Sequence, residues 1–331
     1  MRTTVSGLAT YVWLPRRPRA VLVARTPYGA AGHAAEAAGW MSRDIGFVAQ
    51  DVRGRHESPG TFRPYAEDRC EDGPALLAWV RSRSQAPVVL LGTSYGAHAA
   101  LATASVDQPD GVVVMVPALG LGETARTRGG VLQLASRLGW WLANDVRRPW
   151  TDVVSARRRD DERAVAVGAL ACPLLAIGGT DDHFAHDTVD LWTAWGGPSS
   201  LVIGPWAHDL AGARRAERVL TWLDAVLAGA PPVGVETVDR TGRTRDTPPA
   251  MAAVHVDAGP DDQWCASLAA DGREIAHGAA RGPLVTLGPV VLDGVEPPSF
   301  ELRLSTDDFP RYAASPRPGA PVPRHHLELI S

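Results

Sequence analysis

Short apolar runs alternate with stretches of helical spacing through the first two thirds of the chain. Six runs have the length of buried strands, at residues 20–24, 46–50, 88–91, 112–116, 174–177 and 201–203. Hydrophobic residues recur with helical spacing between most of them, over residues 69–82, 95–104 and 211–227. Fully apolar strands that alternate with helices are typical of a parallel sheet covered on both faces. We therefore expect residues 1–230 to form a doubly wound α/β body.

The interval 119–168 departs from this rhythm. It contains no strand candidate, but residues 131–146 form an amphipathic stretch that includes Trp140 and Trp141. This pattern predicts a helical insertion. Such an insertion could lie over the strand ends as a cap or pack on the flank of the sheet, and the usual placement of functional loops favours the cap.

After Pro231 and Pro232 the pattern changes to β-rich pieces separated by glycine and proline. The pieces lie at residues 252–256, 284–292, 300–304 and 326–330. No long helical period remains there. We expect residues 231–331 to form a small β-sandwich behind a proline-stiffened linker.

Charge and composition exclude several classes of function. The 331-residue chain has a formal charge of −4, and the basic run at residues 157–159 is followed at once by the acidic run 160–162. We therefore expect no nucleic-acid and no membrane partner. All 33 basic residues are arginine, which excludes mechanisms that need a lysine.

The cysteines give no sign of a disulfide framework or a metal site. Cys70, Cys172 and Cys265 are odd in number and far apart in the sequence. The N-terminus has no apolar core of signal-peptide length, and no run reaches the ~18 apolar residues of a membrane span. The sequence thus predicts a soluble, cytoplasmic protein without a cofactor.

A nucleophile-elbow motif follows the predicted strand at residues 88–91. Gly92, Ser94 and Gly96 match G-x-S-x-G, and a small-residue helix follows directly. Such an elbow needs glycines on both sides of the serine so that strand and helix can approach closely. The motif alone occurs often by chance, but its place between a strand and a helix makes Ser94 a candidate nucleophile.

Two later strand ends supply the partners that a serine nucleophile needs. In α/β folds that carry such an elbow, the order of the triad along the chain is serine, acid, histidine. The run 174–177 is followed by Asp181 and Asp182, of which Asp182 is our choice and Asp181 the alternative. The run 201–203 is followed by His208. The expected enzyme takes a small-molecule acyl substrate and forms an acyl-Ser94 intermediate, with the backbone N–H of Tyr95 as one oxyanion donor.

The remaining histidines near these motifs receive a structural or substrate-lining interpretation. His183 and His186 lie beside the acid, and His98 lies on the helix behind the elbow. Adjacent Asp182 and His183 could indicate a metal, but no third ligand at usable spacing is evident, so we predict none.

Five motifs in order resemble one family of hydrolases. They are Arg25-Thr-Pro-Tyr-Gly29, Gln50-Asp-Val-Arg-Gly-Arg55, Gly92-Thr-Ser-Tyr-Gly96, Gly178-Gly179 with Asp182, and Gly204-Pro-Trp-Ala-His208. Together they resemble the X-prolyl dipeptidyl-peptidase and cocaine-esterase (CocE/NonD-like) family of α/β-hydrolases, which also holds α-amino-acid ester hydrolases. Residues 304–311 resemble the C-terminal jelly-roll segment of that family.

The resemblance implies roles for further residues. The Tyr28 hydroxyl would join the Tyr95 amide in the oxyanion hole, and the family's aspartate aligns with Asp182. Asp51 and Arg53 would brace loops as a structural ion pair. The cap and the β-domain are short compared with typical members, so the substrates of the family do not carry over. Candidate substrate-lining residues are Trp140, Trp141 and Trp206.

Three enzymatic functions are compatible with the sequence. The leading one is hydrolysis of a carboxylic ester. An X-Pro dipeptidyl-peptidase is the second, and its carboxylate for the substrate α-amine could be Glu123, Asp145 or Asp152. Transfer of the acyl group to an alcohol or amine, as in an acyltransferase or cyclase, is the third and would require exclusion of water. A binding module with an inert triad is the non-enzymatic alternative.

Overall fold

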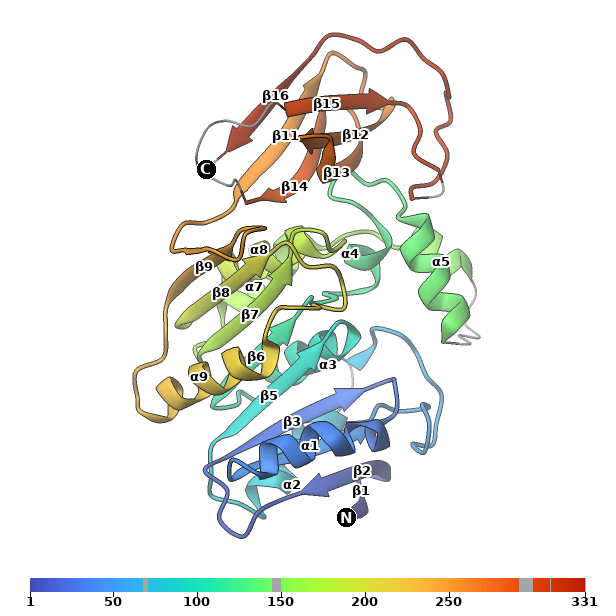
Figure 1. Ribbon diagram of the computed structural model, residues 1–331. Coiled ribbons are helices and arrows are strands. Elements are labelled where there is room, and N and C mark those ends of the chain that lie inside the picture. Colours follow the sequence, from blue (N-terminus) through green and yellow to red (C-terminus); the bar gives the residue numbers. More distant parts are fainter. Residues whose placement is uncertain (68–70, 145–149, 292–299, 310, 331) are drawn as a thin grey trace.

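A ten-stranded mixed sheet forms the body of the molecule (Figure 1). The computed structural model describes residues 1–331 except 68–70, 145–149, 292–299, 310 and 331. The strand order is β1-β2-β4-β3-β5-β6-β7-β8-β9-β10. These strands are β1 Arg2–Val5, β2 Leu8–Trp13, β3 Ala20–Thr26, β4 Ile45–Asp51, β5 Val88–Thr93, β6 Gly111–Met115, β7 Leu174–Gly179, β8 Ser199–Gly204, β9 Gly234–Val238 and β10 Thr244–Arg245.

The central strands are parallel and each predicted apolar run lies in one of them. From β4 across to β9 all neighbours pair in parallel, whereas β1, β2 and β10 join antiparallel at the two edges. Every residue of β3, β4 and β6 is buried. Burial on both faces explains why these strands read as continuous apolar runs. The α/β class predicted from the sequence is confirmed.

Helices cover both faces of this sheet. The body helices are η1 Ala30–His33, α1 Ala34–Met41, α2 Asp72–Arg81, α3 Tyr95–Ala104, α8 Ala185–Ala194 and α9 Arg215–Leu227. Helices α2, α3 and α8 share one apolar core with Val21 and Val23 of β3. Helices α1 and α9 share another core with Leu22 and Ala24. The alternation along β3 sends successive side chains to opposite faces.

Four helices occupy the described part of the interval between β6 and β7. They are α4 Leu121–Ala125, α5 Leu134–Ala143, α6 Trp150–Ser155 and α7 Asp160–Gly168. Helix α7 packs on the body, because Val167 belongs to the same core as α8. Helix α5 stands beside the body in Figure 1, and its Trp140 reaches the Tyr28 hydroxyl at the end of β3. We call residues 119–168 the cap segment.

The C-terminal part is a β-sandwich at the end of the molecule opposite the N-terminus (Figure 1). One antiparallel sheet has the order β14-β11-β16 and the other β13-β12-β15. Both contribute to one apolar core. The strands are β11 Ala250–Val256, β12 Gln263–Ala270, β13 Arg273–Arg281, β14 Leu284–Val290, β15 Phe300–Ser305 and β16 His325–Ile330.

The division between the two parts differs from the one predicted at residue 230. Strand β9 pairs in parallel with β8, and β10 pairs with β9, so the first body continues to Arg245. Ser200 Oγ donates to the carbonyl oxygen of Pro232 at 2.7 Å, which fixes the proline pair to the body. The prolines therefore connect α9 to an edge strand of the same sheet.

The cap segment is tied to the sandwich by backbone contacts. Gly129 forms a bridge with Ala280 of β13, where an added Cβ would clash with the Ala280 side chain. The Leu134 amide donates to the carbonyl oxygen of Arg311 at 3.1 Å. The sandwich therefore helps to hold α5 in place.

Two cysteines of the described residues are free and buried. Burial raises the pKa of the Cys172 thiol to about 11 and that of Cys265 to about 12. Both thiols are therefore unreactive at neutral pH. Cys70 lies outside the described residues.

Among the described residues, no helix combines the length and apolar character needed to cross a membrane.

The turn from β5 into α3 depends on a close backbone approach at Gly92. A Cβ at this position would clash with the carbonyl oxygen of Gly96 and the amide nitrogen of Ala97. These backbone atoms belong to the start of α3 and cannot move without shifting the helix.

Gly92→Ala should therefore destabilise the protein by about 1–3 kcal/mol, the usual cost of overpacking a core. Gly139→Ala is the matched control, because Gly139 is an exposed position inside α5 whose added Cβ meets nothing within 4 Å. That change should be neutral or stabilising by up to about 1 kcal/mol. Urea unfolding measures both, and equal midpoints for the two variants would contradict the expectation.

Candidate active site

Ser94 stands on a strained turn between β5 and α3. Its φ is 53° and its ψ −119°, a conformation that L-residues rarely adopt. The Ser94 amide donates to the carbonyl oxygen of Met115 at 2.9 Å, and its carbonyl oxygen accepts from the Ala118 amide at 3.1 Å. The turn is thus locked to the end of the neighbouring strand β6. This is the backbone geometry expected of a nucleophile elbow.

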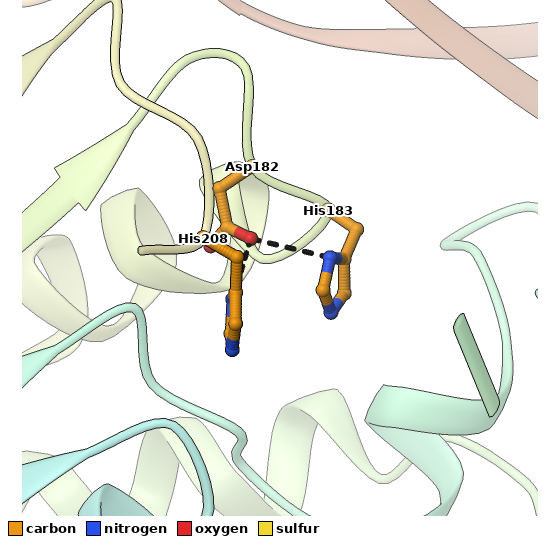
Figure 2. A group of neighbouring side chains, drawn as sticks. All are labelled: Asp182, His183 and His208. Atoms are coloured by element: carbon orange, nitrogen blue, oxygen red, sulfur yellow. Dashed lines mark hydrogen bonds and ion pairs between the residues drawn. The ribbon is translucent and has the colours of Figure 1, made fainter. Parts of the chain in front are cut away.

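His208 and Asp182 reach Ser94 from the loops after β8 and β7. His208 Nε2 lies 3.0 Å from Ser94 Oγ, and His208 Nδ1 lies 2.8 Å from Asp182 Oδ1. Figure 2 shows the contacts from the Asp182 carboxylate to both His208 and His183. Since β5, β7 and β8 are parallel and near one another in the sheet, their carboxyl ends share one edge. A hydroxyl, an imidazole and a carboxylate therefore stand in hydrogen-bonding order.

A glycine lets the two loops approach each other. At Gly179, the last residue of β7, an added Cβ would clash with the carbonyl oxygen of Trp206. The Asp181 amide donates to that same oxygen at 3.2 Å. This contact fixes the loop that carries Asp182 against the loop that carries His208.

The two adjacent aspartates have different environments. The Asp182 side chain is fully buried and faces His208. Asp181 Oδ1 accepts instead from Arg240 at 2.8 Å, and its other oxygen lies 3.6 Å from Arg273. The structure brings Asp182 to the histidine and leaves Asp181 in a partly exposed ion-pair cluster.

Tyr28 lies beside the elbow under the cap segment. The Trp140 Nε1–H donates to the Tyr28 hydroxyl at 2.9 Å. Removal from water raises the pKa of the Tyr28 phenol, although hydrogen bonds from Trp140 and Ser94 partly oppose this effect. The phenol is therefore protonated at neutral pH and can donate a hydrogen bond.

Loop-bracing contacts hold Tyr28 in position. Arg55 Nε and His56 Nε2 lie 2.9 and 3.0 Å from the carbonyl oxygen of Pro27. Asp51 Oδ1 accepts from the Ala30 amide at 2.6 Å. Arg53 pairs with Asp72 at 2.5 Å, so Arg53 and Asp51 both brace loops, although they do not pair with each other.

Tyr95, the first residue of α3, is held by contacts of its buried side chain. Its buried hydroxyl donates to Glu67 Oε1 at 2.7 Å, and its ring stacks on Trp140 with a centroid separation of 5.7 Å. Burial and the Glu67 carboxylate raise the pKa of Tyr95 well above its usual value. Burial alone would raise the pKa of Glu67, but contacts with His98 and Tyr95 outweigh it and lower that pKa.

Glu67 is a site residue that the sequence analysis missed. It lies in a loop without regular periodicity, so no local pattern marks it. The Tyr95 amide begins α3, where backbone N–H groups have no partner inside the helix. The network behind Tyr95 thus fixes the residue whose amide follows Ser94.

The structure separates the three tryptophans suggested as substrate-lining. Trp140 contacts Tyr28 and Tyr95, next to Ser94. Trp141 is instead buried inside the cap segment with Ala125 and Val153. Trp206 is buried in the core under α9. Trp141 and Trp206 are packing residues, because their indole rings fill apolar cores.

His183 and His208 share one carboxylate. His183 Nδ1 lies 3.2 Å from Asp182 Oδ1. Because His208 lies beside the same carboxylate, it is the third potential metal ligand that the sequence did not reveal. Both Nδ1 atoms, however, lie at hydrogen-bonding distance from the same oxygen, whereas zinc ligands surround a common centre at about 2.0 Å. His208 is thus a hydrogen-bonding partner of Asp182, and His183 faces the same oxygen.

The other two histidines lie away from Ser94. His98 is buried behind the elbow, with Nδ1 3.1 Å from the carbonyl oxygen of Leu119. His186 is partly buried near Gly288 of β14, and desolvation lowers its pKa to about 3. Both have the structural role suggested from the sequence.

Comparisons with known proteins agree with the motifs. Residues 6–167 match the family model of X-Pro dipeptidyl-peptidase (S15 family). No curated protein matches the chain by sequence.

Solved structures share the fold at low identity. Two structures of a CocE/NonD family hydrolase from Staphylococcus aureus have TM-scores of 0.66 and 0.62 at 12% identity, covering 98% and 90% of this chain and 89% and 79% of theirs. A putative lipase from Acinetobacter baumannii AYE has a TM-score of 0.50 at 12% identity, covering 69% of this chain and 92% of its own. At such identities the likeness concerns the fold.

The fold and the family match together lead to one conclusion: the chain is a serine hydrolase of the α/β-hydrolase fold, and its residues 6–167 match the model of the X-Pro dipeptidyl-peptidase (S15) family.

Proposed function

We propose that this protein hydrolyses a carboxylic ester through a triad of Ser94, His208 and Asp182. The observation that carries the proposal is the unbroken chain of contacts from Ser94 Oγ to His208 Nε2 at 3.0 Å and from His208 Nδ1 to Asp182 Oδ1 at 2.8 Å. The left-handed φ of Ser94 supports the proposal, because this strained turn exposes the hydroxyl at the carboxyl end of β5.

The reaction proceeds in two halves. His208 Nε2 takes the Ser94 proton while Oγ attacks the ester carbonyl, and Asp182 stabilises the imidazolium. The imidazolium then gives that proton to the leaving alcohol as the C–O bond breaks, which leaves an acyl-Ser94. A water molecule, deprotonated by His208, attacks the acyl carbon, and the proton returns to Ser94 as the acid leaves.

The oxyanion of each tetrahedral intermediate is held by the Tyr28 hydroxyl and the Tyr95 amide. Trp140 donates to the Tyr28 oxygen, which leaves the phenolic hydrogen available to the substrate. The raised pKa of Tyr28 keeps that hydrogen in place at neutral pH. Each such donor contributes about 3 kcal/mol to lowering the barrier.

The surroundings of two acidic residues favour an ester over an X-Pro peptide. Removal of X-Pro dipeptides requires a carboxylate that receives the free α-amine of the substrate. Glu123 is buried, lies 3.7 Å from Arg163 and accepts the Arg159 amide at 3.0 Å. Asp152 lines a cavity of about 940 Å³ whose wall carries five arginines against three carboxylates, and this excess of positive charge opposes the binding of an ammonium group. Asp145 lies outside the described residues.

The X-Pro peptidase remains the second candidate, because the matched family model carries that activity in its description. Transfer of the acyl group to an alcohol or amine stays a prediction from the sequence.

Phosphonate labelling tests the proposal directly. A fluorophosphonate should modify Ser94, and mass spectrometry should locate it there. Ser94→Ala should lose both labelling and turnover, and His208→Ala should label far more slowly. In a substrate panel, p-nitrophenyl esters should be cleaved and X-Pro anilides should not. Modification at another residue, or full turnover by Ser94→Ala, would overturn the triad.

The two aspartates should differ sharply when each is made neutral. Asp182→Asn should lower kcat about 10⁴-fold, because an amide favours the wrong histidine tautomer. Asp181→Asn should stay within a few-fold of wild type, because its partly exposed ion pairs contribute little. Steady-state kinetics on one p-nitrophenyl ester decides the matter, and equal losses would assign the acid wrongly.

Tyr28→Phe should lower kcat about 10²–10³-fold with a small change in KM, because its donor acts on charge that develops in the transition state. Tyr11→Phe is the control, since the Tyr11 hydroxyl bonds to Glu57 at the exposed N-terminal strands. A Tyr28→Phe variant with unchanged kcat would remove Tyr28 from the oxyanion hole.

A further inference from the structure

His183 immediately follows Asp182 and returns to contact its side chain. His183 Nδ1 lies 3.2 Å from Asp182 Oδ1. The ring also stacks on the ring of His208, with centroids 4.8 Å apart and planes inclined by 27° (Figure 2). One side chain thus touches both the acid and the base of the proposed triad.

The Asp182 carboxylate has few other supports. Its side chain is fully buried. Within the described residues, Oδ2 has no hydrogen-bond partner, and the polar side-chain contacts of Oδ1 are those with His208 and His183. A carboxylate held by His208 alone could rotate about its Cβ–Cγ bond together with the imidazole. A second contact, from the ring of His183, restricts that rotation.

His183 is a neutral ring at neutral pH. Burial lowers the pKa of His183 to about 4, although Asp182 partly opposes the shift; the other charged or titratable groups that act on it are His208, Arg137 and His277. At neutral pH the ring therefore carries one proton on nitrogen. The negative charge of the nearby Asp182 carboxylate favours the tautomer with that proton on Nδ1, because a carboxylate oxygen can only accept.

A neutral ring also suits the neighbouring base. When His208 becomes an imidazolium, a positive charge 4.8 Å away would oppose it, whereas the face of an uncharged ring does not. The stacking further restricts the tilt of His208 toward Ser94.

We propose that His183 is a positioning residue, whose Nδ1 faces Asp182 Oδ1 at 3.2 Å and whose ring stacks on His208, so that carboxylate and imidazole keep one alignment through the reaction. This inference rests on the proposed triad. It assigns to His183 a function that acts through Asp182 and touches no substrate.

Two substitutions separate the effect of the Nδ1–H group from that of the ring. His183→Phe keeps an aromatic ring and removes the donor. His183→Asn removes the ring but places an amide N–H where the Nδ1–H lies. We expect His183→Phe to lower kcat about 10-fold, the effect of ~1.4 kcal/mol on the barrier, with KM unchanged. His183→Asn should recover kcat to within about three-fold of wild type, because the ~1.4 kcal/mol lost in His183→Phe is about the contribution of one polar contact of this kind.

A double-variant cycle tests whether the effect passes through the acid. In the Asp182→Asn background, His183→Phe should cause no further loss of kcat, because the oxygen that it orients has already lost its function. Equal losses in both backgrounds would show that His183 acts independently of Asp182 and would overturn the inference. Urea unfolding of each variant checks that the kinetics report folded protein, and His183→Leu replaces the Phe variant if the larger ring prevents folding.

The outcome is distinguishable from a failure of the triad itself. If Ser94→Ala still turns over the ester, the proposed function fails, whatever the His183 variants do. If Ser94 is labelled and required but His183→Phe has the kcat of wild type, the triad holds and the positioning role is rejected.

Discussion

The close packing of backbone around the end of β5 is the constraint on which the site depends. Gly92 lets the start of α3 lie against the strand, and the resulting turn forces Ser94 to a φ of 53°. Hydrogen bonds to the backbone of Met115 and Ala118 hold this strained conformation. Because neighbouring parallel strands end at one edge, the same sheet delivers the loops of β7 and β8 to the serine. Strain at Ser94 is thus stabilised by the sheet that supplies its partners.

Electrostatics around the proposed triad follow from burial. Asp182 is removed from water and faces two imidazole rings, whereas Asp181 is neutralised by arginines at the surface. Burial keeps His183 neutral by lowering its pKa to about 4. An uncharged ring restricts the motion of the carboxylate without neutralising its negative charge. The negative charge of Asp182 is therefore available to stabilise the imidazolium of His208.

The cap segment and the sandwich act on the site indirectly. Trp140 of α5 contacts Tyr28 and stacks on Tyr95, so α5 forms part of the wall around the elbow. Backbone contacts from Gly129 and Leu134 to the sandwich hold this segment. The small sandwich thereby contributes to the alignment of a tyrosine that we propose as an oxyanion donor.

The sequence by itself determined the alternation of strands and helices, the elbow at Ser94 and the two loops that carry Asp182 and His208. These features are local, since apolar periodicity and glycine spacing report burial and backbone conformation within a few residues. Only the tertiary structure decided which aspartate faces the histidine, which tryptophan lies at the site, and that residues 234–245 extend the first sheet. It also revealed Glu67 behind Tyr95 and His183 beside Asp182. Such contacts depend on how distant loops pack together, and a local pattern carries no record of that packing.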